Sequence, residues 1–235
     1  AKPDLGDAPD STNNSNRNMN AYPAPSAVKA NYPTVYSDGS GTGPFGPVHL
    51  NDQLVAFLGK KITTETEADK GTDEDGLNNI NSSTGLANND KGDDGVIFPL
   101  NLPACRWTTF DYIVNIIDPD VDLWVNVWFD WNRDGDWDDT FDCTQGAAPE
   151  WAVQNQMLFN LPVGLNQITT PAILPWHPKG GREQIWMRIM LSEQPFKHGS
   201  NPGAKGNAGS GPQGKYLYGE TEDYYFTPDT SYIIC

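Results

Sequence analysis

The hydrophobic pattern of this chain is that of a β-rich protein. From Leu123 to Phe129, every second residue is aliphatic or aromatic, and Trp124, Asn126 and Trp128 lie between them. A period of two places the two sets on opposite faces of a strand. Similar strand-like runs, separated by Pro and Gly turns at roughly ten-residue spacing, occupy residues 95–102, 109–119, 121–131, 154–163, 166–174, 183–193 and 222–228.

This spacing, without any segment of convincing helical periodicity, predicts an all-β fold, an antiparallel β-sandwich. We expect the sandwich core to comprise residues 95–235. Residues 1–94 are expected to form a long irregular N-terminal arm and an acidic loop region, because they are rich in Asn, Pro, Ser and Gly. Order in such an arm would require ions, packing on the body or a neighbouring subunit.

The net charge of the chain limits which kinds of partner it can bind. The chain has 15 Lys and Arg against 31 Asp and Glu, a net charge of −16. Nucleic acid and anionic membranes repel such a surface, so neither is an expected partner. The sequence also lacks a run of about 20 apolar residues, which a membrane-spanning helix would need. Cations are the natural counterpart.

The chain has three cysteines, Cys105, Cys143 and Cys235. In an oxidising compartment, a Cys105–Cys143 disulfide is expected, and buried free thiols are the alternative. Cys235 could tether the chain to a neighbour or be a frayed end. No CxxC or CxxCH spacing indicates structural zinc or covalent haem.

An acidic segment at residues 128–139, WFDWNRDGDWDD, carries the clearest chemistry. Asp130, Asn132 and Asp134 occupy positions 1, 3 and 5 of a D-x-N-x-D-G loop, and Gly135 follows where the turn needs a positive φ. This spacing directs three side-chain oxygens to one centre. Position 12, where an EF-hand has a bidentate Glu, holds Phe141. The missing ligands must come from elsewhere, and nearby candidates are Asp136, Asp138, Asp139 and Asp142.

Calcium is the ion that best suits this loop. Five close aspartates repel one another by roughly 1 kcal/mol per exposed pair, and a cation removes that cost. Magnesium demands stricter geometry, and an acidic turn without an ion is the alternative. A glycosidase acid pair is not favoured, because the dense cluster lacks a lone carboxyl in an apolar pocket. No nucleophile has an identifiable base, so we expect no enzyme.

Several motifs resemble one family. GETEDYYF at 219–226 resembles the G-E-x-E-D-Y signature of the GEVED domain of bacterial secreted and cell-surface proteins. DLGDAPD at 4–10, the acidic segment at 58–76 and FDWNRDGDWDD at 129–139 resemble other marks of the family, in the same order. The resemblance implies an extracellular β-sandwich whose acidic motifs bind calcium, with no enzymatic activity.

The resemblance extends the ion-binding role to Glu220, Glu222 and Asp223, and to Asp7 and Asp10. Glu222 or Asp223 would supply the ligand that Phe141 cannot. The alternative is that these two acids cap or salt-bridge a turn.

The expected function is therefore that of an extracellular, calcium-stabilised structural protein, which could self-associate into a filament or surface matrix by strand addition from its arm. The alternative is a glycan-binding or adhesive module, with Trp131, Trp137 and Trp176 in loop-like positions where their rings could stack on sugars. Asn13 and Asn81 begin N-x-S sequences, which are N-glycosylation acceptors.

Overall fold

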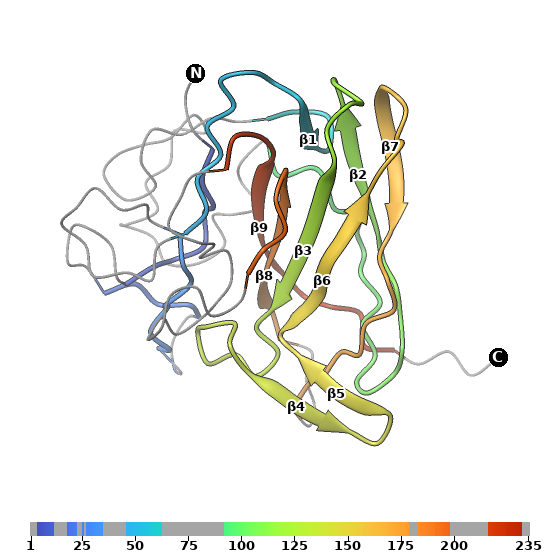
Figure 1. Ribbon diagram of the computed structural model, residues 1–235. Helices are drawn as coiled ribbons and strands as arrows, with labels where there is room; N and C mark the ends of the chain where they lie inside the picture. Colours follow the sequence, from blue (N-terminus) through green and yellow to red (C-terminus); the bar gives the residue numbers. More distant parts are fainter. Residues whose placement is uncertain are drawn as a thin grey trace.

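The computed structural model of the protein is an all-β, sandwich-like fold (Figure 1). It describes residues 4–11, 18–22, 25, 27–34, 46–62, 92–178, 183–197 and 216–231. These residues contain no helix, and so none that could span a membrane. Their strands are β1 (Ala56–Leu58), β2 (Asp111–Ile116), β3 (Leu123–Phe129), β4 (Thr140–Cys143), β5 (Gly146–Pro149), β6 (Trp151–Leu158), β7 (Gly164–Thr169), β8 (Ile185–Ser192) and β9 (Glu220–Phe226).

Two antiparallel sheets form the sandwich. The larger has the order β6-β3-β8-β9, the smaller has the order β1-β2-β7, and β4 pairs with β5 in a separate hairpin. One hydrophobic core lies between the sheets. As the alternation predicted, β3 contributes Leu123, Val125, Val127 and Phe129 to it, facing Tyr112, Val114 and Ile116 of β2.

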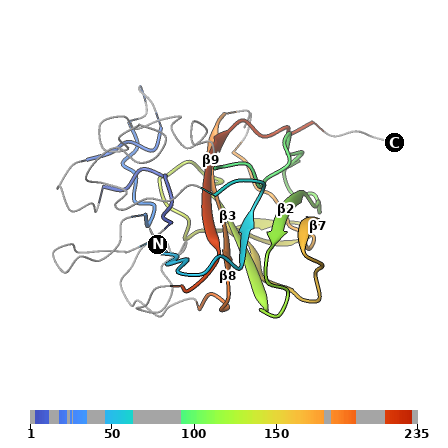
Figure 2. The same cartoon turned by 90° about the horizontal axis from the view of Figure 1, so that it is seen from above.

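The larger sheet is also buried on its other face. There, Trp128, Trp186 and Tyr225 pack against Tyr22 and Tyr32 of the N-terminal arm in a second hydrophobic cluster. Figure 2 shows the described arm segments on one side of β8 and β9, and β2 and β7 on the other. The described molecule is therefore three layers deep: the arm, the larger sheet and the smaller sheet.

Three local predictions differ from the structure. Strand β1 lies within the range expected to be arm, and it pairs with β2, so the smaller sheet includes residues ahead of 95. Residues 95–102 are not a strand, apart from isolated bridges at Val96 and Asn101, because Pro99 has no N–H to donate. The β4–β5 hairpin has no apolar alternation and was not predicted.

The predicted disulfide is confirmed. Cys105 and Cys143 are bonded, with their Cα atoms 5.4 Å apart. The bond ties the segment before β2 to the end of β4, directly after the acidic loop. Cys235 lies outside the described residues.

Candidate metal centre

The acidic loop joins β3 to β4 and folds back on itself through its own side chains. The Asp134 N–H donates to Asp130 Oδ1 (3.1 Å) and to Asn132 Oδ1 (3.2 Å). The Asp138 N–H donates to Asp136 Oδ1 at 3.2 Å in the same way. Short Asp and Asn side chains hold such turns because they can accept a bond from the backbone two residues on.

Gly135 is required at the tip of this loop. Its φ is +94°, in the left-handed region, as the loop spacing predicted. A Cβ at this position would lie 2.3 Å from the carbonyl oxygen of Lys29, and the Gly135 oxygen accepts a bond from the Asn31 N–H. The arm therefore passes directly against the loop.

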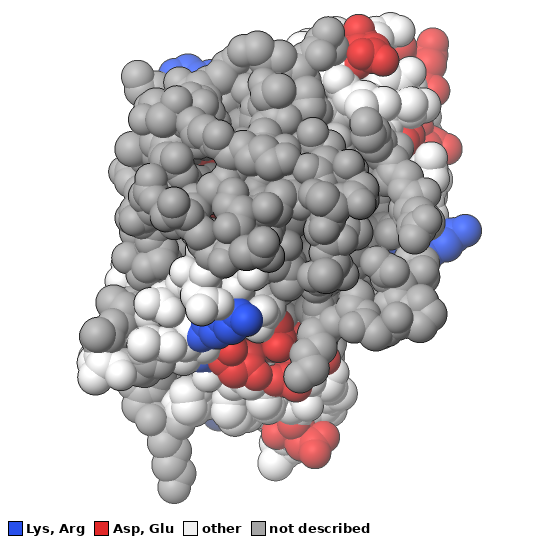
Figure 3. All heavy atoms as spheres, turned by 90° about the vertical axis from the view of Figure 1, so that its left-hand side faces the viewer, with Lys and Arg blue, Asp and Glu red and all other residues white. Residues whose placement is uncertain are grey.

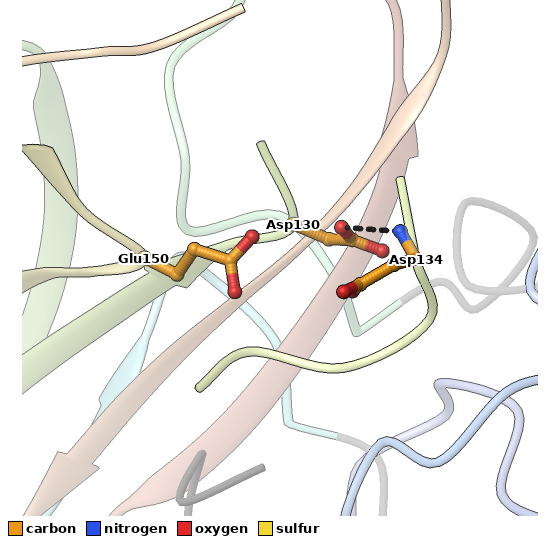
Figure 4. A group of neighbouring side chains, drawn as sticks. All are labelled: Asp130, Asp134 and Glu150. Carbon is orange, nitrogen blue, oxygen red and sulfur yellow. Dashed lines mark hydrogen bonds between the residues drawn. The ribbon is translucent and has the colours of Figure 1, made fainter. Parts of the chain in front are cut away.

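Three carboxylates converge at the base of the loop. Asp130, Asp134 and Glu150 each offer an oxygen, and these atoms all lie within 4.8 Å of one another. Figure 4 shows the three carboxylates side by side, with that of Asp130 turned towards Asp134; Glu150 comes from the junction between β5 and β6. Asp130 and Glu150 are fully buried, whereas Asp134 is exposed.

Burial and mutual repulsion raise the pKa values of this group. Burial, and then the charge of Asp130, raise the pKa of Glu150 to about 10. Burial also raises the pKa of Asp130 to about 6, although bonds from Tyr32, Gly135 and Tyr22 oppose the shift. The pKa of Asp134 is raised by burial. Without a counter-charge, this site favours bound protons, which is the electrostatic state that a cation relieves.

A second group of acids adjoins the first through Asp134. Oxygens of Asp134, Asp136 and Asp139 lie within 4.8 Å of one another. Burial, and then the neighbouring Asp138 and Asp134, raise the pKa of Asp136 to about 8. The Asn132 amide donates to Asp134 (2.9 Å) and Asp139 (2.7 Å), so this predicted ligand bridges the acids with its nitrogen.

Two tyrosines of the arm also reach the loop. Tyr22 Oη and Tyr32 Oη donate to Asp130 Oδ2 at 2.9 and 2.5 Å. Burial, and then the Asp130 charge, raise both tyrosine pKa values well above the usual one, so both hydroxyls stay protonated donors. Asp130 thus belongs to the carboxylate cluster and also binds the N-terminal arm through Tyr22 and Tyr32.

The GETED motif lies on β9, where alternation sends its acids to two different faces. Glu220 and Glu222 face β1 and the segment before β2: Glu220 accepts the Leu58 N–H at 2.7 Å, and Glu222 accepts the Asp94 and Gly95 N–H groups at 3.0 Å. Burial raises the pKa of Glu222 to about 8 and that of Glu220 well above its usual value. These two acids bind backbone.

Asp223 faces the arm and forms a buried ion pair. Arg188 Nε and Nη2 each donate to Asp223 at 2.7 Å, and both side chains are fully buried. Arg188 also donates to the Pro33 carbonyl and to Thr34 Oγ1, and the Ala8 N–H donates to Asp223 at 2.8 Å. One bidentate pair therefore holds two segments of the arm.

The DLGDAPD motif, residues 4–10, is the part of the arm that contacts β8 and β9. Asp4 Oδ2 accepts the Thr221 N–H at 2.8 Å, and Asp10 Oδ2 accepts the Thr34 N–H at 3.0 Å. Asp7 is buried in the same segment. A Cβ on Gly6 would lie 2.5 Å from both Arg188 Nη2 and Asp223 Oδ2, so only glycine fits there. The two motifs fasten the arm to β8 and β9.

These placements correct part of the predicted ligand set. The structure does not bring Glu222 or Asp223 to the loop, because Glu222 accepts bonds from the backbone at 94–95 and from Tyr224, and Asp223 binds Arg188. Glu150 is the acid that lies beside Asp130 and Asp134. The described carboxylate groups likewise do not include Asp7, Asp10, Glu220 or the exposed Asp138. The alternative, a salt-bridge role, applies to Asp223. Sequence spacing could not indicate Glu150, which lies 20 residues beyond Asp130; only its place as the lone charge in GAAPEWAV distinguishes it.

The tryptophans expected to stack on sugars are buried or already packed on another ring. Trp131 and Trp137 are 0% and 1% exposed, so neither ring can face a ligand broadly, and Trp176 is half-buried and stacked on Phe141 at 4.1 Å. The arm and the sandwich core cover positions that looked like open loop. A pocket of about 190 Å³ does lie beside the acidic loop, lined in part by Trp128, Trp151, Asp138, Asp139 and Gln154. The predicted acceptors Asn13 and Asn81 lie outside the described residues.

The surface carries the acidic excess in patches. On the face shown in Figure 3, described Asp and Glu side chains form separate groups, one of which lies directly beside a described Lys or Arg side chain. The arginines that adjoin the loop are engaged elsewhere, since Arg133 pairs with Glu183 at 2.6 Å and Arg188 pairs with Asp223. The cluster of Asp130, Asp134 and Glu150 fits a hard cation with oxygen ligands.

One family model matches the part of the chain that carries this site. The family model of the GEVED domain matches residues 124–227, which run from β3 through β9 and include the acidic loop, Glu150 and GETED. No curated protein and no solved structure was found to match the chain.

Proposed function

The chain contains a GEVED domain, and from its geometry we propose that it is a calcium-stabilised, non-enzymatic structural protein of the cell surface. The observation that carries this proposal is the convergence of Asp130, Asp134 and Glu150 within 4.8 Å, two of them fully buried. Calcium accepts six to eight oxygen ligands in flexible geometry, which suits carboxylates delivered by a loop and a strand. When bound, the ion neutralises the site and stabilises the fold.

The three carboxylates would play different parts in binding the ion. Asp130 and Glu150 hold their orientation through backbone bonds, because Asp130 accepts the Gly135 N–H (3.0 Å) and Glu150 accepts the Trp131 (2.9 Å) and Asp139 (3.0 Å) N–H groups. Asp130 Oδ2 is fully used by Tyr22, Tyr32 and Gly135, but Asp130 Oδ1 accepts the Asp134 N–H and each Glu150 oxygen accepts one N–H. Each of these three oxygens has two lone pairs and so keeps one for an ion. Asp134 is exposed and would close the site from the solvent side.

A structural role at the cell surface rests on further observations. The Cys105–Cys143 disulfide supports an oxidising compartment. The hydrogen bonds of GETED and DLGDAPD support a role for these motifs in holding the fold together. We further propose that copies of the chain self-associate into a filament or matrix.

The test of the ion is thermal unfolding in calcium and in EDTA, on the wild type and on Asp134→Asn. A ligand that binds only the folded state adds about 2.7 kcal/mol at one hundred times its Kd, which corresponds to about 5–10 °C for a chain of this length. We expect the wild type to gain this in calcium. Asp134→Asn should lose most of the gain and yet fold, because its exposed side chain keeps one acceptor oxygen.

The matched control is Asp142→Asn. Asp142 is exposed on β4 near the same loop but belongs to neither carboxylate group. It should keep the full calcium response. Equal melting temperatures of the wild type in calcium and in EDTA would overturn the proposal.

Glycan binding is the second candidate function, and the pocket beside the loop favours it. The partly buried ring of Trp151 and polar groups of Asp139 and Gln154 line this pocket together with the fully buried Trp128, a combination suited to a sugar that stacks on Trp151. The buried Trp128 Nε1–H has no hydrogen-bond acceptor among the described residues, and a ligand hydroxyl would supply one. A glycan array with no signal, from a protein that assembles normally, would favour the structural role.

A further inference from the structure

We propose that the open edge of β7, with the apolar corner at its start, is the surface through which two copies of this chain join. The two β7 strands would pair antiparallel and turn two three-stranded sheets into one continuous six-stranded sheet. This inference rests on the self-association in the proposed function and names its surface. The partner is a second copy of the same chain.

The backbone of β7 is available for pairing. Among the described strands, β7 pairs with β2 alone, residue for residue from Gly164 to Thr169 without a register shift. The Thr170 N–H donates to the Phe110 carbonyl, so by alternation the backbone groups of Leu165 and Gln167 point away from β2. Figures 1 and 2 both place β7 at the rim of the molecule.

The other edges of the two sandwich sheets are protected, and most of β7 is not. Strand β1 has only three residues, all buried. Strand β9 is covered by bonds to Leu58 and Asp4, and the pairing of β6 with β3 carries register shifts. Natural edge strands avoid pairing through shortness, coverage, bulges or charge. Strand β7 is regular, six residues long and uncharged, and the bond from Gln156 to the Thr169 carbonyl covers only its last residue.

Absence of charge extends well beyond β7. In a chain that is 20% Asp, Glu, Lys and Arg, residues 151–178 contain none of them over 28 positions (178 − 151 + 1). This segment supplies β6, β7 and their connection. Because each copy carries a net charge of −16, two copies repel one another over most of their surface. An uncharged edge is where they can approach, which favours a second copy as the partner.

An apolar corner adds contact area next to this edge. Phe159, Val163 and Leu165 are 63%, 64% and 54% exposed, and Ile117 is 46% exposed. They share one end of the sandwich, because Ile116 pairs with Gly164 and Leu123 pairs with Leu158. Large apolar groups gathered at an open edge strand mark an association surface.

Charge also selects the register. Asp111 lies at the far end of the edge, bonded to Gln167 and Thr169 at 2.7 Å. A twofold axis at Leu165 puts the two Leu165 side chains opposite each other and keeps the two Asp111 carboxylates at opposite ends. Like charges placed across from one another would oppose pairing. Association should strengthen with added salt, because salt screens the repulsion between the copies.

The test is sedimentation velocity of the full chain over a series of concentrations, on the wild type, Leu165→Lys and Gln167→Pro. The lysine introduced by Leu165→Lys would face its own copy across the axis, so we expect the dimer dissociation constant of this variant to rise at least about tenfold. Gln167→Pro removes an N–H that points away from β2, so it spares the pairing with β2 and tests strand pairing between the copies. Leu217→Lys is the matched control, because Leu217 is 49% exposed and lies outside this edge. Circular dichroism and melting temperature verify that each variant folds.

A cross-link tests the register. In a Cys235→Ser background, Leu165→Cys should form a covalent dimer on oxidation, because facing residues of paired strands lie at disulfide distance. Leu217→Cys should not. A wild type that stays monomeric would overturn this inference and the proposed self-association, leaving the calcium proposal intact. Association that neither Leu165→Lys nor Gln167→Pro weakens would overturn only the β7 edge.

Discussion

The two acidic motifs of this protein look alike in sequence and behave differently in the structure. In the loop at 130–139, Asp130 and Asp134 face one another and Glu150 across 4.8 Å or less, with no arginine among them. On β9, Glu222 and Asp223 point to opposite faces, where one meets backbone N–H groups and the other meets Arg188. A loop can turn successive acids towards one point, whereas a strand must separate them. A run of acidic residues therefore indicates an ion site only where the backbone conformation can bring the acids together.

The largest effect should come from breaking the buried Arg188–Asp223 ion pair on β8 and β9. Asp223→Asn leaves Arg188 buried without its full counter-charge, which typically costs about 3–5 kcal/mol. We expect urea denaturation to show this loss equally in calcium and in EDTA. A loss confined to calcium would mean that the β9 motif belongs to the ion site, and the contrast between the motifs would fail.

A smaller effect should follow when the arm is detached from the loop. Tyr32→Phe removes a buried donor to Asp130 and is expected to cost about 1.5–3 kcal/mol, the usual range for a bond to a charged group. Because an ion would compete with the tyrosines for the negative charge of Asp130, the loss should be smaller in calcium than in EDTA. Tyr218→Phe, at a partly buried tyrosine outside the cluster, is the control for urea melts.

The third effect concerns pH, and it is spread over several pH units. The pKa of Glu150 is raised to about 10 and that of Asp136 to about 8. A raised carboxyl pKa contributes stability that is present below the ordinary value near 4.5 and is lost as pH rises through the folded-state value. In EDTA, the melting temperature should therefore fall by about 2–4 °C for each kcal/mol lost between pH 5 and pH 9.

Calcium should weaken the pH dependence of the melting temperature only in part, because Glu220 and Glu222, whose pKa values are also raised, lie outside the cluster. Glu222→Gln should reduce the pH dependence that remains in calcium, since its amide oxygen can accept the Gly95 N–H or the Tyr224 hydroxyl in place of the carboxylate. A pH dependence that calcium abolishes completely would place Glu222 in the ion site.

Local patterns predicted what local forces decide. The alternation in β3 and the positive φ of Gly135 were evident from local spacing. The pairing of Cys105 with Cys143 joins distant segments, but the chain has only three cysteines, so few pairings were possible. Other contacts between distant segments were not evident. Glu150 reaches the loop only because β3 and β6 pair, and Trp131 and Trp137 are buried because tertiary packing covers them. Arm residues such as Tyr22 and Tyr32 have no periodic signal, since they bind through single side chains and not through a strand.

The arm layer over Trp128, Trp186 and Tyr225 has a consequence for how such domains are delimited. The stretch that matches the family begins at residue 124, yet the face of its sheet is completed by residues as early as 4–11. A clone trimmed to the matching stretch would carry the signature and leave aromatic side chains bare to water, inviting aggregation. The stretch that matches the family and the unit that folds therefore have different boundaries, and an expression experiment must contain the longer unit.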